Sequence, residues 1–228
     1  MYLPPAFKTD DLACLHEVIR RYPLATLVTK SGNRIAADHI PFLLDTTGGN
    51  QGVLRAHVAR ANPLWQVHPA DAEALVIFTG PDHYITPSWY VTKHETGKAV
   101  PTWNYVTVHA YGLLRVFDDA VWLRQQIEAL TARHEAGHTP PWSVTDAPDD
   151  FIAAQMKAIV GIEIAITHLE GKLKISQNRP QADQAGVIAG LTASSGPNPA
   201  HALAQLMTQT VRTSTPDVHS GRNDTFAS

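Results

Sequence analysis

The segment LATLVTKSGNRIAADHIPFLLDTTGGNQGVLRAHV, residues 24–58, decides the fold class of this chain. Leu24 to Lys30 predict a strand, the SGN that follows is typical of a tight turn, and Arg34 to Asp45 predict a returning strand. A second turn, TTGGNQG, leads into a third predicted strand at Val53 to Val58. Hairpins that follow one another directly point away from a parallel α/β sheet.

The sequence on either side of this segment adds helices and more strands. A helix that Thr9 or Asp10 can cap is stopped by Pro23, and another opens at Asp118 or Asp119. The other predicted helices cover residues 61–68, 148–159, 182–191 and 199–211, and the other strands cover 74–79, 105–117, 162–166 and 172–176. Helices inserted between hairpins favour a mainly β, α+β fold, an antiparallel barrel with peripheral helices.

A barrel of six or seven strands is too narrow for a large internal cavity. A cofactor would therefore bind on the outer wall of the barrel, most easily where two copies of the chain meet. No linker separates two domains, so we expect one domain over residues 1–212. Residues 213–228 are small and polar, which predicts a flexible tail.

The composition bounds the class of protein. The 228 residues are 44% hydrophobic and 17% charged, as in a soluble globular protein. The net charge of −3 gives no global attraction to nucleic acid or to an anionic membrane. The chain begins without a signal-peptide pattern and has no apolar run long enough to span a bilayer, and Cys14 is its single cysteine. These features predict a cytoplasmic protein without membrane contact.

An aromatic segment at residues 78–112 is the strongest sign of a ligand. It holds six of the eleven Trp and Tyr residues, interleaved with prolines and with hydrogen-bonding side chains that include Ser88, Lys93 and Thr102. Flat rings with a polar edge on a stiff backbone suit a planar, partly polar ligand. The alternative is a loop-rich β segment whose aromatic residues are core.

Trp103, Asn104 and Tyr105 follow one another on a predicted strand. The amide of Asn104 therefore takes one face of the strand, and the rings of Trp103 and Tyr105 take the other. A flavin needs hydrogen-bond partners around its pyrimidine edge. We therefore expect Thr102 and Asn104 to face the ligand, and Trp103 and Tyr105 to pack mainly in the core.

Two groups of polar residues could hold an anion. Arg60 and Asn62 lie where a strand enters a short helix, a place at which backbone N–H groups are unpaired. Alternatively Arg60 is a solvated surface residue and Asn62 only caps the helix. The second group, on a strand end, comprises Lys172, Lys174, Ser176, Gln177, Asn178 and Arg179. It either forms a charged edge that prevents aggregation or closes an anionic site on a partner subunit.

The sequence His134-Glu135-Ala136-Gly137-His138 matches the zinc-protease pattern H-E-x-x-H. The helix from residue 119 carries an apolar face made of Trp122, Leu123, Ile127, Leu130 and His134, and that from residue 148 one made of Phe151, Ile152, Gln155, Met156 and Ile159. Gly137 and the prolines after it end the first helix between the two histidines, so we expect no metal site. Phosphate-loop, esterase and redox-thiol patterns are also missing from the sequence.

Six ordered blocks between Met1 and Leu191 resemble the PaiB family, whose members are called FMN-binding negative transcriptional regulators. The blocks are ADHIPF from residue 37, HVARANPLW from 57, FTGP from 78, PSWY from 87, VPTWNY from 100 and LEGKLKISQNR from 169. The resemblance implies a split β-barrel like that of pyridoxamine-phosphate oxidases, assembled as a homodimer with FMN at the interface.

The resemblance also implies where the flavin would bind. Its phosphate would be held by His57, Arg60 and Asn62. Its ring would lie along a wall made by Ile40 to Leu44 and by Thr102 to Tyr105, with Ile40, Phe42, Thr102 and Asn104 as the binding residues. Lys174, Gln177 and Arg179 would arrive from the other subunit. The resemblance assigns no catalytic residue.

Four functions remain in competition on the sequence. The first is a dimeric flavin-binding regulator, and the second an FMN-dependent oxidoreductase acting on an unknown small molecule. The third exchanges the flavin for haem, with His39, His57 and His109 as possible ligands. The fourth is a repressor that binds DNA directly, which the acidic charge balance does not support.

Overall fold

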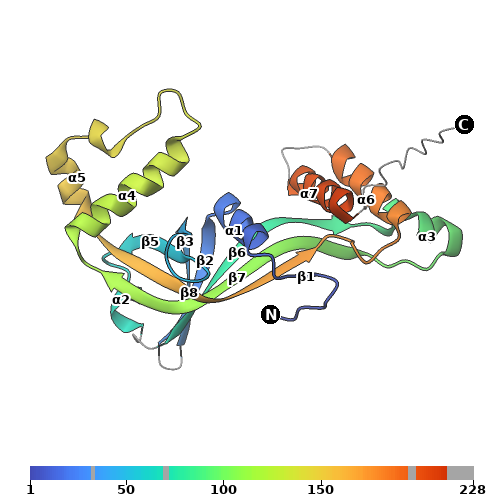
Figure 1. The fold of residues 1–228 in the computed structure, drawn as a ribbon, viewed down its shortest axis with the longest axis horizontal. Coiled ribbons are helices and arrows are strands. Elements are labelled where there is room, and N and C mark those ends of the chain that lie inside the picture. Colours follow the sequence, from blue (N-terminus) through green and yellow to red (C-terminus); the bar gives the residue numbers. More distant parts are fainter. Residues whose placement is uncertain (32–33, 69–71, 195–198, 215–228) are drawn as a thin grey trace, which may run out of the picture. The chain divides into compact units, whose positions relative to one another are not determined.

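The computed structural model describes residues 1–31, 34–68, 72–194 and 199–214 (Figure 1). The chain divides into two compact units: unit 1 comprises residues 1–80 and 106–173, and unit 2 comprises 81–105 and 174–228. Residues 32 and 33 of the predicted first turn and residues 215–228 of the predicted tail lie outside the described residues.

Eight strands form one sheet, and every pair of strands with a defined register is antiparallel. The hydrogen-bonded order is β3-β2-β6-β7-β8-β5-β4, and the two-residue β1 pairs with β8. The strands are β1 (Lys8–Thr9), β2 (Leu24–Ser31), β3 (Arg34–Pro41), β4 (Leu43–Asp45), β5 (Val53–Ala59), β6 (Glu73–Ile85), β7 (Thr102–Phe117) and β8 (Ile159–Lys174). The antiparallel sheet predicted from the hairpins is confirmed.

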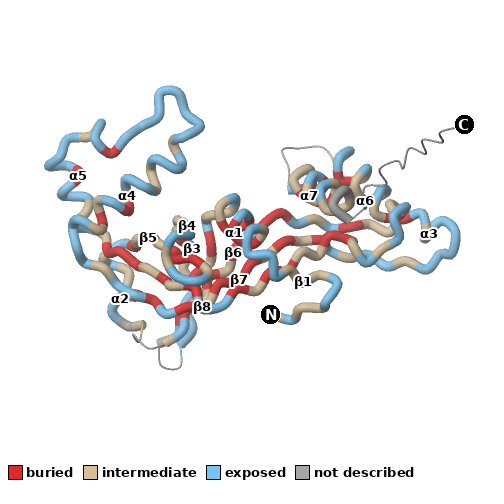
Figure 2. Tube along the Cα trace, in the orientation of Figure 1, coloured by how far each residue is buried: buried red, intermediate tan, exposed pale blue. Residues whose placement is uncertain are grey.

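The two ends of this path are neighbours along the chain. β3 and β4 lie at opposite ends of the path, yet Phe42 alone separates them in the sequence. The sheet therefore has to curl, because one residue spans less than 4 Å. β3 also contacts β5, which completes the curled wall. Phe42 is buried, and Figure 2 shows the buried residues concentrated along the strands.

The pairing of β5 with β8 shows how the sheet divides its two faces. Leu54, Ala56 and Val58 are buried, whereas Arg55 and His57 alternate with them and lie on the outer face. Arg55 lies opposite Glu163 in the register and its Nε donates to the Glu163 carboxylate at 3.0 Å. His57 lies opposite Gly161, where the Trp122 ring fills the space that a side chain would take.

Unit 1 also carries α1 (Leu12–Arg21), α2 (Leu64–Val67), α4 (Ala120–Glu135), a 3₁₀ turn η2 (Val144–Asp146) and α5 (Asp149–Met156). The predicted caps are nearly correct. Asp11, rather than Thr9 or Asp10, caps α1 by accepting from two backbone N–H groups. Asp119 caps α4, as predicted, by accepting from the N–H of Trp122 at 2.8 Å.

α4 rests on the outer face of the sheet through its first turns. The Trp122 ring stacks on Phe117 with 4.7 Å between ring centroids, and it covers Gly161. Leu123 and Gln126 are buried, but His134, which was predicted to share the apolar face, is exposed. The prediction failed there because the last turn of α4 extends past the surface that its first turns cover. On α5 the prediction was also wrong for Phe151, which is 53% exposed, and for the exposed Gln155, and Ile159 begins β8 because the helix ends at Met156.

The H-E-x-x-H pattern is interrupted as predicted. α4 ends at Glu135, and His138 follows the last helical turn. Among the described residues no group of His, Cys, Asp and Glu side chains is arranged to hold a metal ion. Within the same residues, no helix is long and apolar enough to cross a lipid bilayer.

Unit 2 packs four helical segments beside the ends of β6, β7 and β8. These are η1 (Pro87–Trp89), α3 (Val91–Thr96), α6 (Gln181–Ala193) and α7 (Pro199–Ser214). Asp183 on α6 is fully buried and accepts from the backbone N–H and the hydroxyl of Thr92, which ties α3 to α6. Trp89 lies against Gly186 and Gly190, where any Cβ would collide with it.

Replacing Gly161 with alanine tests the seat of α4. A Cβ at Gly161 would lie 2.2 Å from Cζ3 of Trp122, so the indole has to move and α4 with it. We expect the free energy of unfolding to fall by about 1–3 kcal/mol, as in overpacked cores. Urea denaturation followed by Trp fluorescence measures this loss.

Gly137→Ala is the matched control, because a Cβ at Gly137 has nothing within 4 Å. Its stability should stay within about 0.5 kcal/mol of the parent protein. Equal urea midpoints for both variants would mean that Trp122 does not sit on Gly161.

Candidate functional site

A large open cavity lies between β3 and the start of α2, within unit 1. Its volume is about 760 Å³, which is in the range of small-molecule and cofactor sites. Its walls come from residues 34–38 of β3 and residues 61–64 before and at the start of α2, together with Thr29 and His68. We call this the β3–α2 cavity.

β3 gives this cavity a hydrogen-bonding wall. β3 ends the hydrogen-bonded path of the sheet, and within the described residues its register is with β2. In an antiparallel pair, alternate residues direct their N–H and C=O groups away from the partner strand. Residues 34–38 therefore present backbone donors and acceptors on the side away from β2, and all five are exposed or half-buried.

Asn62 is held in place on the opposite wall. Its Nδ2 donates to Asp38 at 2.8 Å, and its Oδ1 accepts from the N–H of Leu64 at 2.9 Å. The side chain thus supports the entry into α2, which was the structural alternative for this residue, and it also links α2 to β3. Arg34 brings a cation to the same cavity and forms no ion pair with the part of the chain that the structure describes.

Arg60 lies in a different environment from Asn62, although only two residues separate them. Its Nη1 and Nη2 donate to the two carboxylate oxygens of Asp118 at 2.8 and 2.6 Å. Its remaining donors reach the backbone oxygens of Lys157 and Ile159 at 2.8 and 3.1 Å. Because Arg60 donates to Asp118, the pKa of this carboxyl is lowered and that of the guanidinium is raised.

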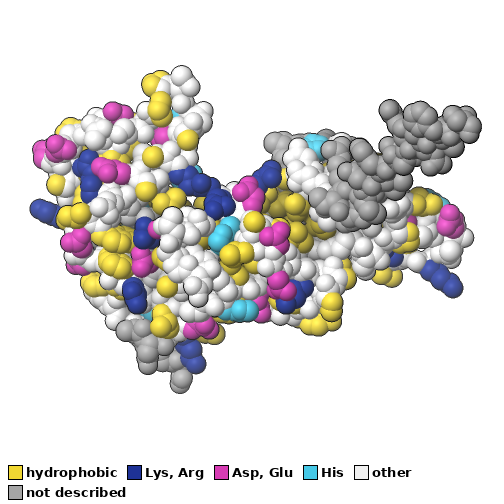
Figure 3. All heavy atoms as spheres, viewed as in Figure 1, with side chains coloured by type: hydrophobic (Ala, Val, Ile, Leu, Met, Phe, Trp, Pro, Cys, Tyr) yellow, Lys and Arg dark blue, Asp and Glu magenta, His cyan; other side chains and the backbone are white. Residues whose placement is uncertain are grey.

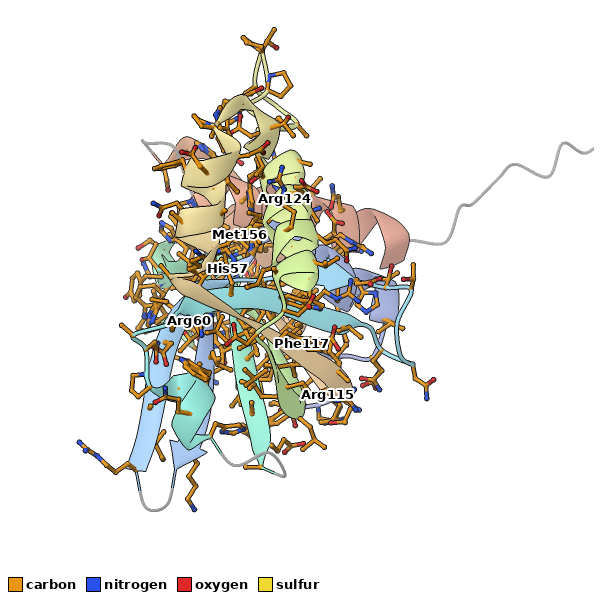
Figure 4. All side chains as sticks on the ribbon, turned by 90° about the vertical axis from the view of Figure 1, so that its left-hand side faces the viewer. His57, Arg60, Arg115, Phe117, Arg124 and Met156 are labelled. Carbon is orange, nitrogen blue, oxygen red and sulfur yellow. The ribbon has the colours of Figure 1, made fainter. Side chains whose placement is uncertain are left out.

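This clamp places Arg60 at a second cavity, of about 400 Å³, between α4 and α5. Figure 4 shows His57 and Arg60 on the sheet, with Arg124 and Met156 on the helices that stand on it. The structure therefore separates the predicted phosphate-binding residues: Arg60 lines the α4–α5 cavity and Asn62 lines the β3–α2 cavity. The predicted role of both residues toward a phosphate stays a prediction.

His57, the third residue of this group, is largely enclosed on the outer face of β5. Burial lowers the pKa of its imidazole, which is therefore neutral at pH 7. Its Nδ1 is buried and has no hydrogen-bond partner among the described residues. The same holds for Nδ1 of His109, whose pKa is also lowered, chiefly by burial.

The predicted ring wall is a core element in this structure. Ile40 and Phe42 are 6% and 1% exposed. Phe42 meets the ring of Phe78 edge to face, with 6.2 Å between centroids. Their contact with a flavin stays a prediction, and in the described chain both side chains fill the interior of unit 1.

Unit 2 brings together most of the other predicted residues. Nζ of Lys174 donates to the Thr102 hydroxyl at 2.5 Å and to the backbone oxygen of Trp103 at 2.8 Å. Gln177 accepts from the N–H of Ile175 at 2.9 Å. Arg179 lies over the ring of Tyr90, with 4.6 Å from its guanidinium carbon to the ring centroid. Ser88 is exposed and Lys93 half-buried, and neither lines a cavity described above.

Asn104 and Trp103 take the opposite places from those predicted. Asn104 is 1% exposed and donates to the Ser176 hydroxyl at 2.9 Å, whereas Trp103 is 54% exposed. The expectation that Trp103 packs in the core is therefore wrong. The sequence contained a signal for the correct face. Val106, Val108 and Ala110 are apolar and lie on the same side of β7 as Asn104, and all three are buried in the structure.

Ser176 is the residue of this group that sequence reasoning undervalued. Its φ of 64° is left-handed, a conformation that non-glycine residues adopt rarely. The buried hydrogen bond with Asn104 holds the side chain at this turn. No spacing or composition signal in the sequence marks a left-handed serine, so only the structure identifies it.

Asn104→Ala should lower the free energy of unfolding by about 1–3 kcal/mol, because it leaves a buried hydroxyl without its partner. The matched control is Asn178→Ala, the same change at an exposed position of unit 2. Chemical denaturation should find the control within about 0.5 kcal/mol of the parent protein. If the two variants unfold alike, the Asn104–Ser176 bond does not stabilise unit 2.

Comparison with known proteins gives the family. Residues 1–168 match the family model described as "Putative FMN-binding domain". An uncharacterised protein of Emericella nidulans, AN0679, is 39% identical over 225 residues, with 83% of this chain and 90% of that protein covered. Protease synthase and sporulation protein PAI 2 of Bacillus subtilis is 29% identical over 207 residues, with 91% and 96% covered.

The fold has a counterpart among solved structures. The flavocytochrome Anf3 of Azotobacter vinelandii superimposes with a TM-score of 0.57 at 11% identity, over 73% of this chain and 69% of that one. This likeness concerns the fold alone. It agrees with the predicted antiparallel split β-barrel with peripheral helices, which is confirmed. Because the family model covers most of the chain, this protein belongs to the FMN-binding domain family that the sequence blocks resembled.

Proposed function

We propose that this protein binds FMN in the β3–α2 cavity and acts as a dimeric, flavin-dependent regulator in the cytoplasm. The observation that supports the binding site best is the origin of the cavity walls. Six of the eleven lining residues, Ala37, Asp38 and residues 61–64, come from two of the sequence blocks that carry the family resemblance, the one from residue 37 and the one from residue 57. Both blocks lie within the 168 residues that match the family model.

The walls of the cavity suit the isoalloxazine ring. Ile35, Pro63 and Leu64 offer apolar contact surface. The outward backbone groups of β3 suit the pyrimidine edge of the ring, which carries both hydrogen-bond donors and acceptors. Backbone groups of a strand are fixed by the sheet, so they lose little conformational freedom when the ring binds.

Arg34 is the cation that we assign to the phosphate. It lines the cavity, and no carboxylate of the described chain pairs with it. Arg60, the residue that the family resemblance favours, would first have to exchange its bidentate bond with Asp118 for the phosphate. Charge-assisted bonds of this kind are among the stronger ones in proteins, so the exchange offsets much of the gain.

Arg34→Gln should therefore weaken FMN binding about ten-fold or more, which is the usual effect of losing one charge-assisted hydrogen bond. Riboflavin lacks the phosphate, and its affinity should stay unchanged. Quenching of flavin fluorescence during titration measures both affinities.

Arg115→Gln is the matched control, since Arg115 is exposed on β7 and lines neither cavity. Arg60→Gln completes the set. A selective loss of FMN in Arg60→Gln, with Arg34→Gln unaffected, would move the phosphate to the α4–α5 cavity and contradict our assignment.

The dimer part of the proposal rests on an exposed aromatic pair in unit 2. Tyr84 and Trp103 are 44% and 54% exposed, and their rings meet edge to face with 6.0 Å between centroids. Aromatic residues are enriched in the cores of protein–protein interfaces. A second copy of the chain is the partner that we assign to this pair, in agreement with the homodimer that the family resemblance implies.

Sedimentation velocity should find the protein at twice its chain mass of 24.9 kDa. Trp103→Ala should shift it toward the monomer, because the change removes the larger ring of the exposed pair. Trp142→Ala makes the same substitution at a 45% exposed Trp of unit 1 and should leave the dimer intact. A parent protein that sediments as a stable monomer would refute the dimer.

The regulatory role is supported by the family resemblance and by the Bacillus relative that is named for protease synthesis and sporulation. Neither the net charge nor the distribution of charged side chains favours direct binding of DNA. The net charge is −3, and on the face drawn in Figure 3 Lys and Arg side chains are interspersed with Asp and Glu. We therefore assign the regulation to the flavin-binding state rather than to a basic DNA-binding surface.

Haem binding is the second candidate function. It is favoured by the neutral, largely enclosed imidazoles of His57 and His109, whose Nδ1 atoms accept or donate no hydrogen bond in the described structure, although that of His109 lies 3.9 Å from the Glu170 carboxylate. Neutral imidazole is a common axial ligand of haem iron. The visible spectrum of the protein, after incubation with each cofactor, separates the two: bound flavin gives two bands, and haem gives one intense Soret band.

A further inference from the structure

We propose that the α4–α5 cavity is a separate binding site for a small amphipathic carboxylate, a straight-chain aliphatic acid. The cavity lies on the outer face of unit 1, and the proposed FMN site does not include it. Its volume of about 400 Å³ lies at the lower end of the range for small-molecule sites, which suits a ligand smaller than a flavin.

The two helices supply an apolar floor. Ala120 and Leu123 line the cavity from α4, and Ala153 and Met156 line it from α5. Met156 is flexible and adapts to ligands of slightly different shape, and Leu123 is 3% exposed and fixed. An alkyl chain buried against these four side chains would gain stability from the surface it removes from water.

The rim of the cavity carries cations that are open to an anion. Lys157 lines it and forms no ion pair with any described residue. The Nε of Arg124 donates to Glu128 at 2.5 Å. The two terminal nitrogens of Arg124 can then donate to a ligand. Asp149 lies 4.0 Å from Nη1 and is 95% exposed, so water screens that pair.

The acidic residue on the opposite side of the cavity does not cancel this charge. Asp118 is already neutralised by the bidentate bond with Arg60. Lys157 is therefore the cation at the rim that pairs with no carboxylate of the described residues, and Arg124, which is paired with Glu128 through Nε, adds its terminal N–H groups. A carboxylate head fits them because it accepts from an ammonium and from the parallel N–H groups of a guanidinium.

The buried face of α4 has unused hydrogen-bonding capacity one turn beyond Leu123, at a residue that does not itself line the cavity. Gln126 lies three residues after Leu123 and so on the same face of the helix. It is 3% exposed, and neither Nε2 nor Oε1 has a partner in the described structure. An unpaired buried amide is unfavourable, so a polar group that enters beneath α4 gains more than it would at an ordinary surface.

Sodium octanoate is the probe for this site, measured by isothermal titration calorimetry on the full chain. We expect saturable binding of octanoate, and none of octanol or octylamine at the same concentration. Lys157→Gln and Arg124→Gln should each weaken octanoate binding about five-fold, a moderate effect because both groups are partly exposed. Ala153→Phe should abolish binding by filling the floor.

Arg115→Gln, a cation outside the cavity, is the matched control and should bind octanoate like the parent protein. Circular dichroism and the thermal midpoint verify that Ala153→Phe is folded. Binding that octanol matches, or that the Lys157 and Arg124 variants retain in full, would overturn the proposal.

Two further measurements separate this site from the proposed FMN site. Octanoate should bind with unchanged affinity to protein saturated with FMN and to Arg34→Gln. Displacement of octanoate by FMN would make the α4–α5 cavity part of the flavin site and overturn the separate site. If neither cavity binds FMN but octanoate still binds as expected, the proposed function fails and this inference stands.

Discussion

The fold depends on the single residue between β3 and β4. These strands form the two ends of the hydrogen-bonded path, and Phe42 alone joins them, so the sheet cannot stay open. A curled wall of this size fills its interior with side chains, as the buried faces of β5 and β7 do. Ligand sites are thereby confined to the outer surface, and both cavities described above lie there, against helices.

The turn after β5 directs two residues that are close in the sequence, Arg60 and Asn62, into chemically different environments. Arg60 is drawn to Asp118 and to the backbone at the start of β8, and Asn62 is drawn to Asp38 on β3. One residue thus fastens the strand end to the helical side of unit 1, and the other fastens α2 to the opposite edge. The sequence suggested one anion site that contains both Arg60 and Asn62. In the structure the two residues line different cavities.

Local features of the chain were readable from its sequence, and long-range partners were not. The β2–β3 hairpin, the cap at Asp119 and the interruption of the H-E-x-x-H pattern follow from short-range chemistry and were predicted. The Arg60–Asp118 pair joins residues 58 apart in the chain, and no local pattern announces it. The prediction for Asn104 failed for a different reason. The alternation along β7 placed Asn104 on the same face as apolar residues, but the polar amide was expected to face a ligand instead.

β6, β7 and β8 each pass from one unit into the other without a break, so neither unit is encoded by a continuous piece of the chain. Side chains of a strand alternate with a strict period of two, and this alternation carries across the boundary. A single residue gained or lost inside β7 would exchange the inward and outward faces of everything beyond it. Evolution can therefore change side chains along these strands, but it can change the length of the chain only in the connections between them.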